Sequence, residues 1–160
     1  MKRLCTIAAL AATAAACSGD GGLAGSIHDQ FKRSGKRSVD LGTAVPGPWQ
    51  RVCVIGPYMD NAATRKTLGF AWDSEKVSDV AQNEAKVLLV FVDAGDRVAA
   101  FVDYRRDRGD FSNLAGQCFA RPDAVFEQVS RPLHGWSGLF PKSALPAKDG
   151  DWHPVQRTKE

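Results

Sequence analysis

Residues 86–104, KVLLVFVDAGDRVAAFVDY, decide the fold. Two apolar runs, 87–92 and 98–102, flank the turn-forming sequence at 93–96, Asp-Ala-Gly-Asp. β-Branched and aromatic residues on both sides of a short turn that contains Gly are typical of a β-hairpin. Because both runs are apolar at almost every position, we expect both strands to be covered on both faces or to lie centrally in a sheet.

The sequence before this hairpin predicts a further strand and a helix. Residues 51–55, RVCVI, are rich in β-branched side chains and stop at a Gly-Pro pair, which predicts a strand. Asp60 can cap the start of a helix over 61–68, and Gly69 stands where a helix C-terminus favours a left-handed residue. We expect this helix to pack on the sheet.

After the hairpin, residues 117–120 and 124–126 predict additional strand segments, interrupted by Arg-Pro-Asp at 121–123. Together these elements predict an α+β fold, with a small, mostly antiparallel four-stranded sheet, one packed helix and one disulfide. The folded domain is predicted to span residues 48–130.

The first residues of the chain have the features of a secretory signal. Lys2 and Arg3 precede an Ala-rich apolar stretch with no acidic residue, and residues 1–16 form the predicted signal peptide. This stretch is shorter than the roughly 20 residues that a transmembrane helix needs. Residues 14–17, AAAC, resemble the lipobox of bacterial lipoproteins, although Ala14 stands where that family most often has Leu. The alternative is ordinary cleavage after the A-x-A site.

The number of cysteines favours the lipoprotein interpretation. Removal of Cys5 with the signal peptide leaves Cys17, Cys53 and Cys118, which is an odd number for an oxidising compartment. A lipid on Cys17 leaves Cys53 and Cys118 free to form a disulfide. We therefore expect membrane attachment through lipidated Cys17 in the cell envelope. Ser18 after the cysteine favours the outer membrane, facing the periplasm, in enterobacteria-like sorting.

The two flanks of the predicted domain contain few residues that could fill a core. Residues 17–47 are rich in Gly and Ser and are predicted to be the lipidated cysteine and a flexible tether, although Leu23, Ile27 and Phe31 recur at the spacing of a short helical turn. Residues 131–160 form a predicted Pro-rich C-terminal tail, which either wraps the domain or extends from it.

Within the predicted domain, several strings resemble a known group of proteins. Residues 49–58, WQRVCVIGPY, are followed by LGFAW at 68–72, by GDF at 109–111 and by Cys-Phe at 118–119. These strings resemble small bacterial envelope proteins that have no assigned activity. The resemblance supports the cysteine pairing and the domain boundaries, and it implies no enzyme activity.

Charge and motif spacing argue against several classes of function. Without Lys2 and Arg3 the chain keeps 19 basic residues against 18 acidic ones, so no nucleic-acid partner is expected. Its three histidines lack the spacing of metal ligands, and no C-x-x-C motif is present, so we predict neither a metal site nor a cofactor. We also find no catalytic constellation, and we predict that the protein is not an enzyme.

Five residues are candidates for contact with a ligand or a partner. Arg105, Arg106 and Arg108 follow the second hairpin strand and could bind an anionic group or an acidic protein surface. The alternative is a solvated loop, since Asp107 lies among them and surface ion pairs are weak. The aromatic candidates each border a turn, and they are Trp49 and Tyr58.

The resulting prediction is a bacterial lipoprotein that acts as a non-catalytic envelope module and holds or inhibits a protein partner. One alternative is a periplasmic small-ligand-binding protein or enzyme that uses the rim formed by Arg105, Arg106 and Arg108. Another is a purely structural contact at the outer membrane or cell wall.

Overall fold

The computed structural model describes residues 22–130 and 135–145. The predicted signal peptide, residues 1–16, and the predicted lipidation site, Cys17, lie outside these ranges. None of the helices in the described ranges is long and apolar enough to cross a bilayer.

The predicted hairpin belongs to a four-stranded antiparallel sheet with the strand order β4-β3-β2-β5. Its strands are β2 (Trp49–Ile55), β3 (Lys86–Asp93), β4 (Val98–Arg105) and β5 (Cys118–Ala120). Every residue of β3 between its two ends is buried, as the apolar run predicts. Strand β4 lies at the edge of the sheet, and exposed residues interrupt its half-buried ones. The expectation of full cover is therefore wrong for β4.

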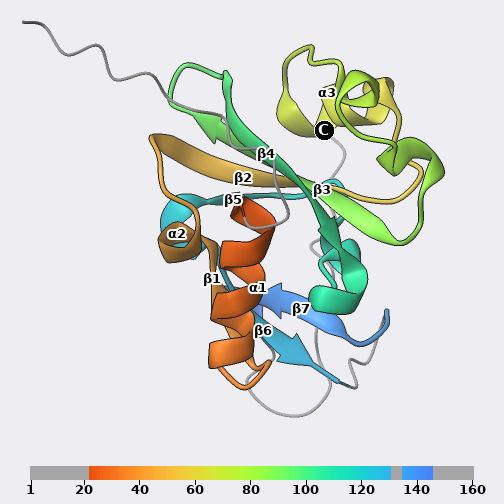
Figure 1. The fold of residues 1–160 in the computed structure, drawn as a ribbon. Coiled ribbons are helices and arrows are strands. Elements are labelled where there is room, and N and C mark those ends of the chain that lie inside the picture. Colours follow the sequence, from red (N-terminus) through yellow and green to blue (C-terminus); the bar gives the residue numbers. More distant parts are fainter. Residues whose placement is uncertain (1–21, 131–134, 146–160) are drawn as a thin grey trace, which may run out of the picture.

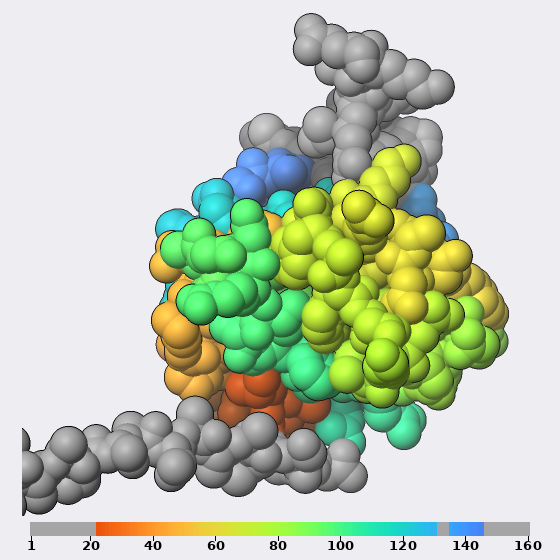
Figure 2. Space-filling model, turned by 90° about the horizontal axis from the view of Figure 1, so that it is seen from above, coloured from red at the N-terminus to blue at the C-terminus, as the bar shows by residue number. Residues whose placement is uncertain are grey.

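Helix α3 (Asn61–Leu68) forms where the sequence predicts it. The Asp60 side chain accepts a hydrogen bond from Ala63 N at 2.8 Å, and Gly69 ends the helix with φ at 86°. Both ends therefore follow the expected capping chemistry. Figure 2 looks down on this side of the molecule, where α3 and the following residues form much of the surface. Two short 3-10 helices follow, Ser74–Lys76 and Val80–Gln82.

A second antiparallel sheet, which the sequence did not predict, covers the opposite side. It has the order β1-β6-β7 and consists of β1 (Ser38–Asp40), β6 (Val125–Val129) and β7 (Gly138–Pro141). The 3-10 helix over Arg121–Asp123 separates β5 from β6, so the two strand segments join different sheets. Figure 1 shows this second sheet below the first, with α1 (Leu23–Arg33) beside it.

The predicted domain boundaries are corrected on both sides. The segment expected to be a tether contains α1, β1 and α2 (Leu41–Ala44), and the segment expected to be a tail contains β7. Leu23, Ile27 and Phe31, which recur at intervals of four, form an apolar stripe along α1 that packs against the main core. Arg121 holds α2 and the loop after it in place. Its guanidinium donates to Gly42 O in α2 at 3.0 Å and to Gly47 O in the loop at 2.6 Å. The buried residues of this segment are Ile27, Phe31, Val39, Leu41 and Val45.

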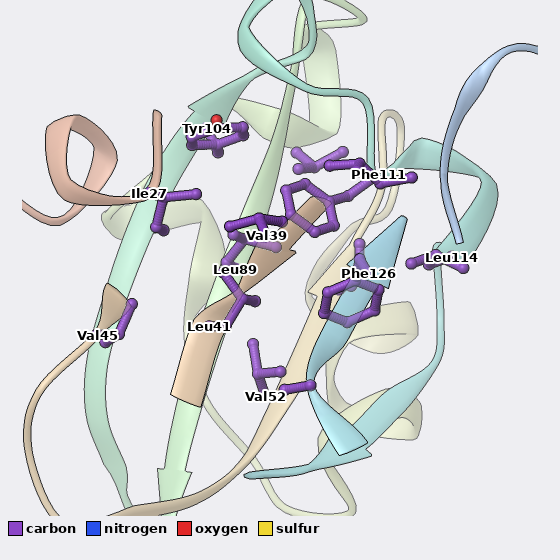
Figure 3. Packing of buried hydrophobic residues seen from close by; sticks show 14 of the residues in the cluster. Ile27, Val39, Leu41, Val45, Val52, Leu89, Tyr104, Phe111, Leu114 and Phe126 are labelled. Carbon is purple, nitrogen blue, oxygen red and sulfur yellow. The ribbon is translucent and has the colours of Figure 1, made fainter. Parts of the chain in front are cut away.

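The main core lies between the two sheets and is rich in aromatic rings. Phe111 makes edge contacts with Tyr104 at 5.6 Å and with Phe126 at 5.3 Å between ring centroids. In Figure 3 the side chains of the N-terminal segment converge on this group. The buried Tyr104 hydroxyl donates to Arg108 O at 2.9 Å, and burial raises the pKa of Tyr104. The polar tip of the ring is therefore satisfied inside an apolar environment.

The predicted disulfide is present. Cys53 and Cys118 are directly opposite each other on β2 and β5 and are joined across 65 positions of sequence. Cys53 is buried, whereas Cys118 is exposed. The bond therefore fastens the three-residue edge strand β5 to the centre of the sheet.

Candidate functional site

The three arginines predicted to form a rim lie at the end of β4 and in the 3-10 helix that follows, Arg106–Arg108. Two of them already contact carboxylates. Arg105 pairs with Asp107 at 2.6 Å, and Arg106 pairs with Asp110 at 2.9 Å. The rim is therefore partly neutralised by its own chain.

Arg106 is the most firmly held of the three. Its Nε and Nη2 both donate to the Asp110 carboxylate, and its Nη1 donates to Glu84 O at 2.9 Å. The hydrogen bonds to Asp110 raise the pKa of Arg106. On the outer side, the guanidinium carbon lies 5.8 Å from the centre of the Trp136 ring, within the range of a cation–π contact.

Trp136 is a candidate contact residue that the sequence interpretation missed. Its ring is 52% exposed, although Nε1 donates to Ser112 Oγ at 3.0 Å. Asn113 fixes the backbone as well, since its Nδ2 donates to Trp136 O at 2.8 Å. The available signal was an isolated aromatic residue in a segment rich in Pro and Gly, which does not reveal where the ring lies.

Tyr58 is exposed, as expected for a contact residue, and its backbone is unusual. Its φ of 64° lies in the left-handed region, which bulky residues rarely adopt. Its N–H donates to Val80 O at 3.0 Å, and its hydroxyl donates to Glu84 Oε2 at 3.1 Å. The Glu84 carboxylate raises the pKa of Tyr58. The turn therefore presents a phenol ring that is 66% exposed at the cost of backbone strain.

Glu84 joins these residues into one surface, which we call the ridge and define as Tyr58, Glu84, Arg106 and Trp136. The Glu84 carboxylate accepts from Tyr58, while its carbonyl accepts from Arg106. The ridge thus assembles four segments that are distant in sequence. Tyr, Trp and Arg are the residues most enriched at the energetic centres of protein interfaces.

The other predicted contact residues do not belong to the ridge. Trp49 is fully buried, its Nε1 donates to Val45 O at 2.9 Å, and its ring lies 4.6 Å from the Arg121 guanidinium carbon. The prediction that Trp49 contacts a ligand is therefore wrong, because a bulge in β2 turns the ring into the core. Arg108 contributes its carbonyl, which accepts from Tyr104. Arg105 lies beside the ridge, paired with Asp107.

A second candidate site is an open hollow of about 610 Å³ beside the disulfide. Met59 and Gln117 lie in its wall, and Lys66 is the charged residue of its lining. Cys118 borders it, with Sγ 3.3 Å from Thr67 O. Its lining mixes polar and apolar side chains, and Lys66 is the single cationic group that it offers to a small molecule.

Comparisons with known proteins assign no family to the chain. No protein-family model matches it, and neither a curated protein nor a solved structure matches it. The resemblance to small bacterial envelope proteins therefore stays a prediction. Within the described ranges, no group of three or more His, Cys, Asp or Glu side chains is arranged to hold a metal ion.

Proposed function

We propose that this protein is a non-catalytic binding module of the bacterial cell envelope, attached by a lipid on Cys17 to the outer membrane and facing the periplasm. Its ridge contacts a protein partner. The observation that carries the proposal is the exposed pair Tyr58 and Trp136 with the immobilised Arg106 guanidinium beside Trp136.

The ridge is ordered before any partner arrives. Binding normally costs about 0.5–1.5 kcal/mol for each long side chain that it immobilises. Arg106 has already lost this freedom, because Asp110 and Glu84 O fix its guanidinium, and its side chain is still 30% exposed. The favoured partner surface offers acceptor groups for the arginine and flat apolar area for the two aromatic rings.

The distance between anchor and domain supports a role close to the membrane. Helix α1 begins at Leu23, six positions after Cys17. A fully extended chain spans at most about 3.6 Å per residue, so a lipid on Cys17 holds the domain within about 20 Å of the bilayer surface. A partner would therefore be a membrane protein or a protein that reaches the inner surface of the outer membrane.

The test is capture of an envelope protein by the chain that carries Cys17→Ser. Trp136→Ala should weaken a stoichiometric complex by at least about tenfold, which corresponds to 1.4 kcal/mol. Val77→Ala is the matched control, since Val77 is also an exposed apolar residue, at 40%, and lies outside the ridge. A partner that binds both variants equally would contradict the role of the ridge.

Lipid attachment is tested separately by the intact mass of the chain extracted from membranes. A diacyl or triacyl increment on Cys17 supports the proposal, and Cys17→Ser should then move the protein to the soluble fraction. An unmodified chain that starts elsewhere would contradict the anchor without bearing on the ridge.

The alternative is a periplasmic small-ligand-binding protein or enzyme that uses Arg105, Arg106 and Arg108. The ion pairs with Asp107 and Asp110 argue against it, because an anionic ligand must compete with carboxylates that already occupy two of the guanidinium groups. A tight small-molecule ligand in the absence of any protein partner would favour this alternative.

A further inference from the structure

Strand β4 leaves one side of its backbone open. In its antiparallel pairing with β3, Leu89 lies opposite Val102 and Phe91 opposite Ala100, while Arg106 N donates to Ala85 O. Because peptide groups alternate in direction along a strand, those of Val102 and Ala100 face β3, and those of Phe101 and Asp103 face outward. Within the described ranges, the outward groups of these two residues have no hydrogen-bond partner.

The middle of this edge carries few of the features that usually prevent strands from pairing. Residues 98–102, VAAFV, contain neither a charge nor a proline, and the Phe101 ring is 43% exposed. The Asp103 carboxylate does not protect the edge, because it accepts hydrogen bonds from Ser78 and Lys86. A register shift near Val98 disturbs the first part of the strand and leaves the rest regular. The unpaired peptide groups of a regular strand edge are a template for another strand.

We propose that β4 pairs antiparallel with β4 of a second copy of this chain, so that the four-stranded sheet continues across both copies. In such a pair, only peptide groups that face away from β3 in each copy can form hydrogen bonds across the two-fold axis. Phe101 of one copy then lies opposite Asp103 of the other, and Val102 lies opposite itself. Isologous pairing of this kind closes a dimer and leaves no further β4 edge open.

Charge at the two ends of β4 favours a second copy as the partner. Antiparallel pairing about a two-fold axis brings the hairpin turn of one copy next to the arginine rim of the other. Residues 93–97 contain two Asp and one Arg, whereas residues 105–108 contain three Arg and one Asp, so the two ends carry opposite charge excesses. Opposite charges across paired strands are stabilising, and like charges are destabilising.

The ion pairs within each copy leave charged groups at both ends of β4 accessible. Arg97 and Asp96 are 80% and 66% exposed, although their partners Asp93 and Arg51 are more buried, at 15% and 31%. Arg105 and Asp107, which pair at the other end, are 66% and 61% exposed. Pairs between exposed groups contribute about 0–1 kcal/mol each, so the exposed members can share a further partner at low cost. Dimerisation does not require the ridge, and a failed dimer would leave the proposed ridge partner untouched.

The first experiment is sedimentation velocity of the Cys17→Ser chain over a range of concentrations, with amide hydrogen exchange on the same samples. We expect a dimer that Phe101→Lys weakens by at least about tenfold, while the control Val77→Lys does not. The Phe101 and Asp103 amides should gain protection only in the dimer, whereas the Val102 amide is protected throughout. A monomer at every concentration, or Phe101 and Asp103 amides protected in the monomer, would overturn the proposal.

A cysteine placed on the axis tests the register. At a non-hydrogen-bonded position, opposite Cα atoms lie about 4.5 Å apart, which suits a disulfide. Val102→Cys should therefore give a reducible dimer under mild oxidation. Ala99→Cys is the control, because Ala99 is exposed, lies at the register shift and would not face itself across the axis. Equal cross-linking of both variants would mean random collision and would refute the paired edge.

Discussion

The two faces of β2 and β3 are buried by different means. The face towards α1 and the second sheet carries Val52, Val54, Leu89 and Phe91 and meets a continuous set of aromatic rings. The opposite face carries Cys53, Ile55, Leu88 and Val90 and meets α3 and its short helical turns. A smaller apolar cluster there is supplemented by a helix cap, an ion-pair group around Lys86 and the disulfide.

The first face depends on area and packing, whereas the second depends on a few discrete bonds. Apolar burial is insensitive to pH and redox state, while caps, ion pairs and disulfides are not. Both proposed contact surfaces draw on the second side: Tyr58 follows β2 next to α3, and Phe101 packs on Trp72 at 5.5 Å. The two faces should therefore respond differently to pH and to reduction.

The largest expected effect lies on the packed face. Trp49→Ala should lower the free energy of unfolding by about 5 kcal/mol, because it removes a fully buried ring and its contacts with Phe91 and Arg121. Trp136→Ala, at an exposed ring, should cost less than about 0.5 kcal/mol. Urea denaturation of both variants measures the contrast. Similar losses would mean that Trp136 also belongs to the core.

The disulfide is expected to be the strongest single element of the other face. Cys53→Ala with Cys118→Ala should lower the free energy of unfolding by about 4 kcal/mol, as the chain-entropy model gives for a loop of 65 positions. Reduction should reproduce the effect, since Cys118 is exposed to reductant. Urea midpoints with and without dithiothreitol measure it. Thiols that react in the native oxidised protein would contradict the pairing.

A smaller loss is expected at the start of α3. Asp60→Ala should cost about 1 kcal/mol, because it removes the side-chain acceptor for Ala63 N and leaves a helix donor without its cap. Asp60→Asn is the matched variant that keeps an acceptor oxygen and most of the stability. Chemical denaturation compares the two. Equal losses would show that charge, and not capping, gives Asp60 its effect.

The smallest expected effect is a change in acid sensitivity. The hydrogen bond from Lys86 holds the pKa of Asp79 below its ordinary value of 3.8, so the carboxylate stabilises the fold above that value. This contribution is lost as the pH falls through the lowered pKa of the folded state. Asp79→Asn should therefore flatten the fall in melting temperature below about pH 4, whereas Asp29→Asn, on the exposed side of α1, should not. If the melting temperatures of the parent chain, Asp79→Asn and Asp29→Asn fell equally steeply at acid pH, the role of Asp79 would be contradicted.

Local patterns predicted the elements whose causes are local. The hairpin around 93–96, the strand at 51–55 and the helix between Asp60 and Gly69 all form, and the expected disulfide joins Cys53 to Cys118. In each case the signal lies within the element itself or in the parity of a few cysteines. The periodicity of α1 was visible too, but its surroundings rich in Gly and Ser hid its role in the core.

The ridge and the N-terminal part of the core could not be predicted in this way. Trp49 and Trp136 are both tryptophans next to turns. Only the bulge in β2, the hydrogen bond that Trp136 donates to Ser112 and the one that it accepts from Asn113 decide which ring is buried. Likewise, no local pattern around Arg106 indicates that its guanidinium donates both to the Asp110 carboxylate and to Glu84 O.

The sequence by itself determined the α+β class, the four-stranded sheet, the capped helix and the cysteine pairing, because short-range hydrophobic patterns, turn residues and capping groups act over a few residues. The tertiary structure decided that residues 23–45 and β7 complete the core, that β4 lies at an open edge and that Tyr58, Arg106 and Trp136 share one surface. These outcomes depend on contacts between segments far apart in the chain. Such contacts are set by how the two sheets pack, and no local pattern encodes them.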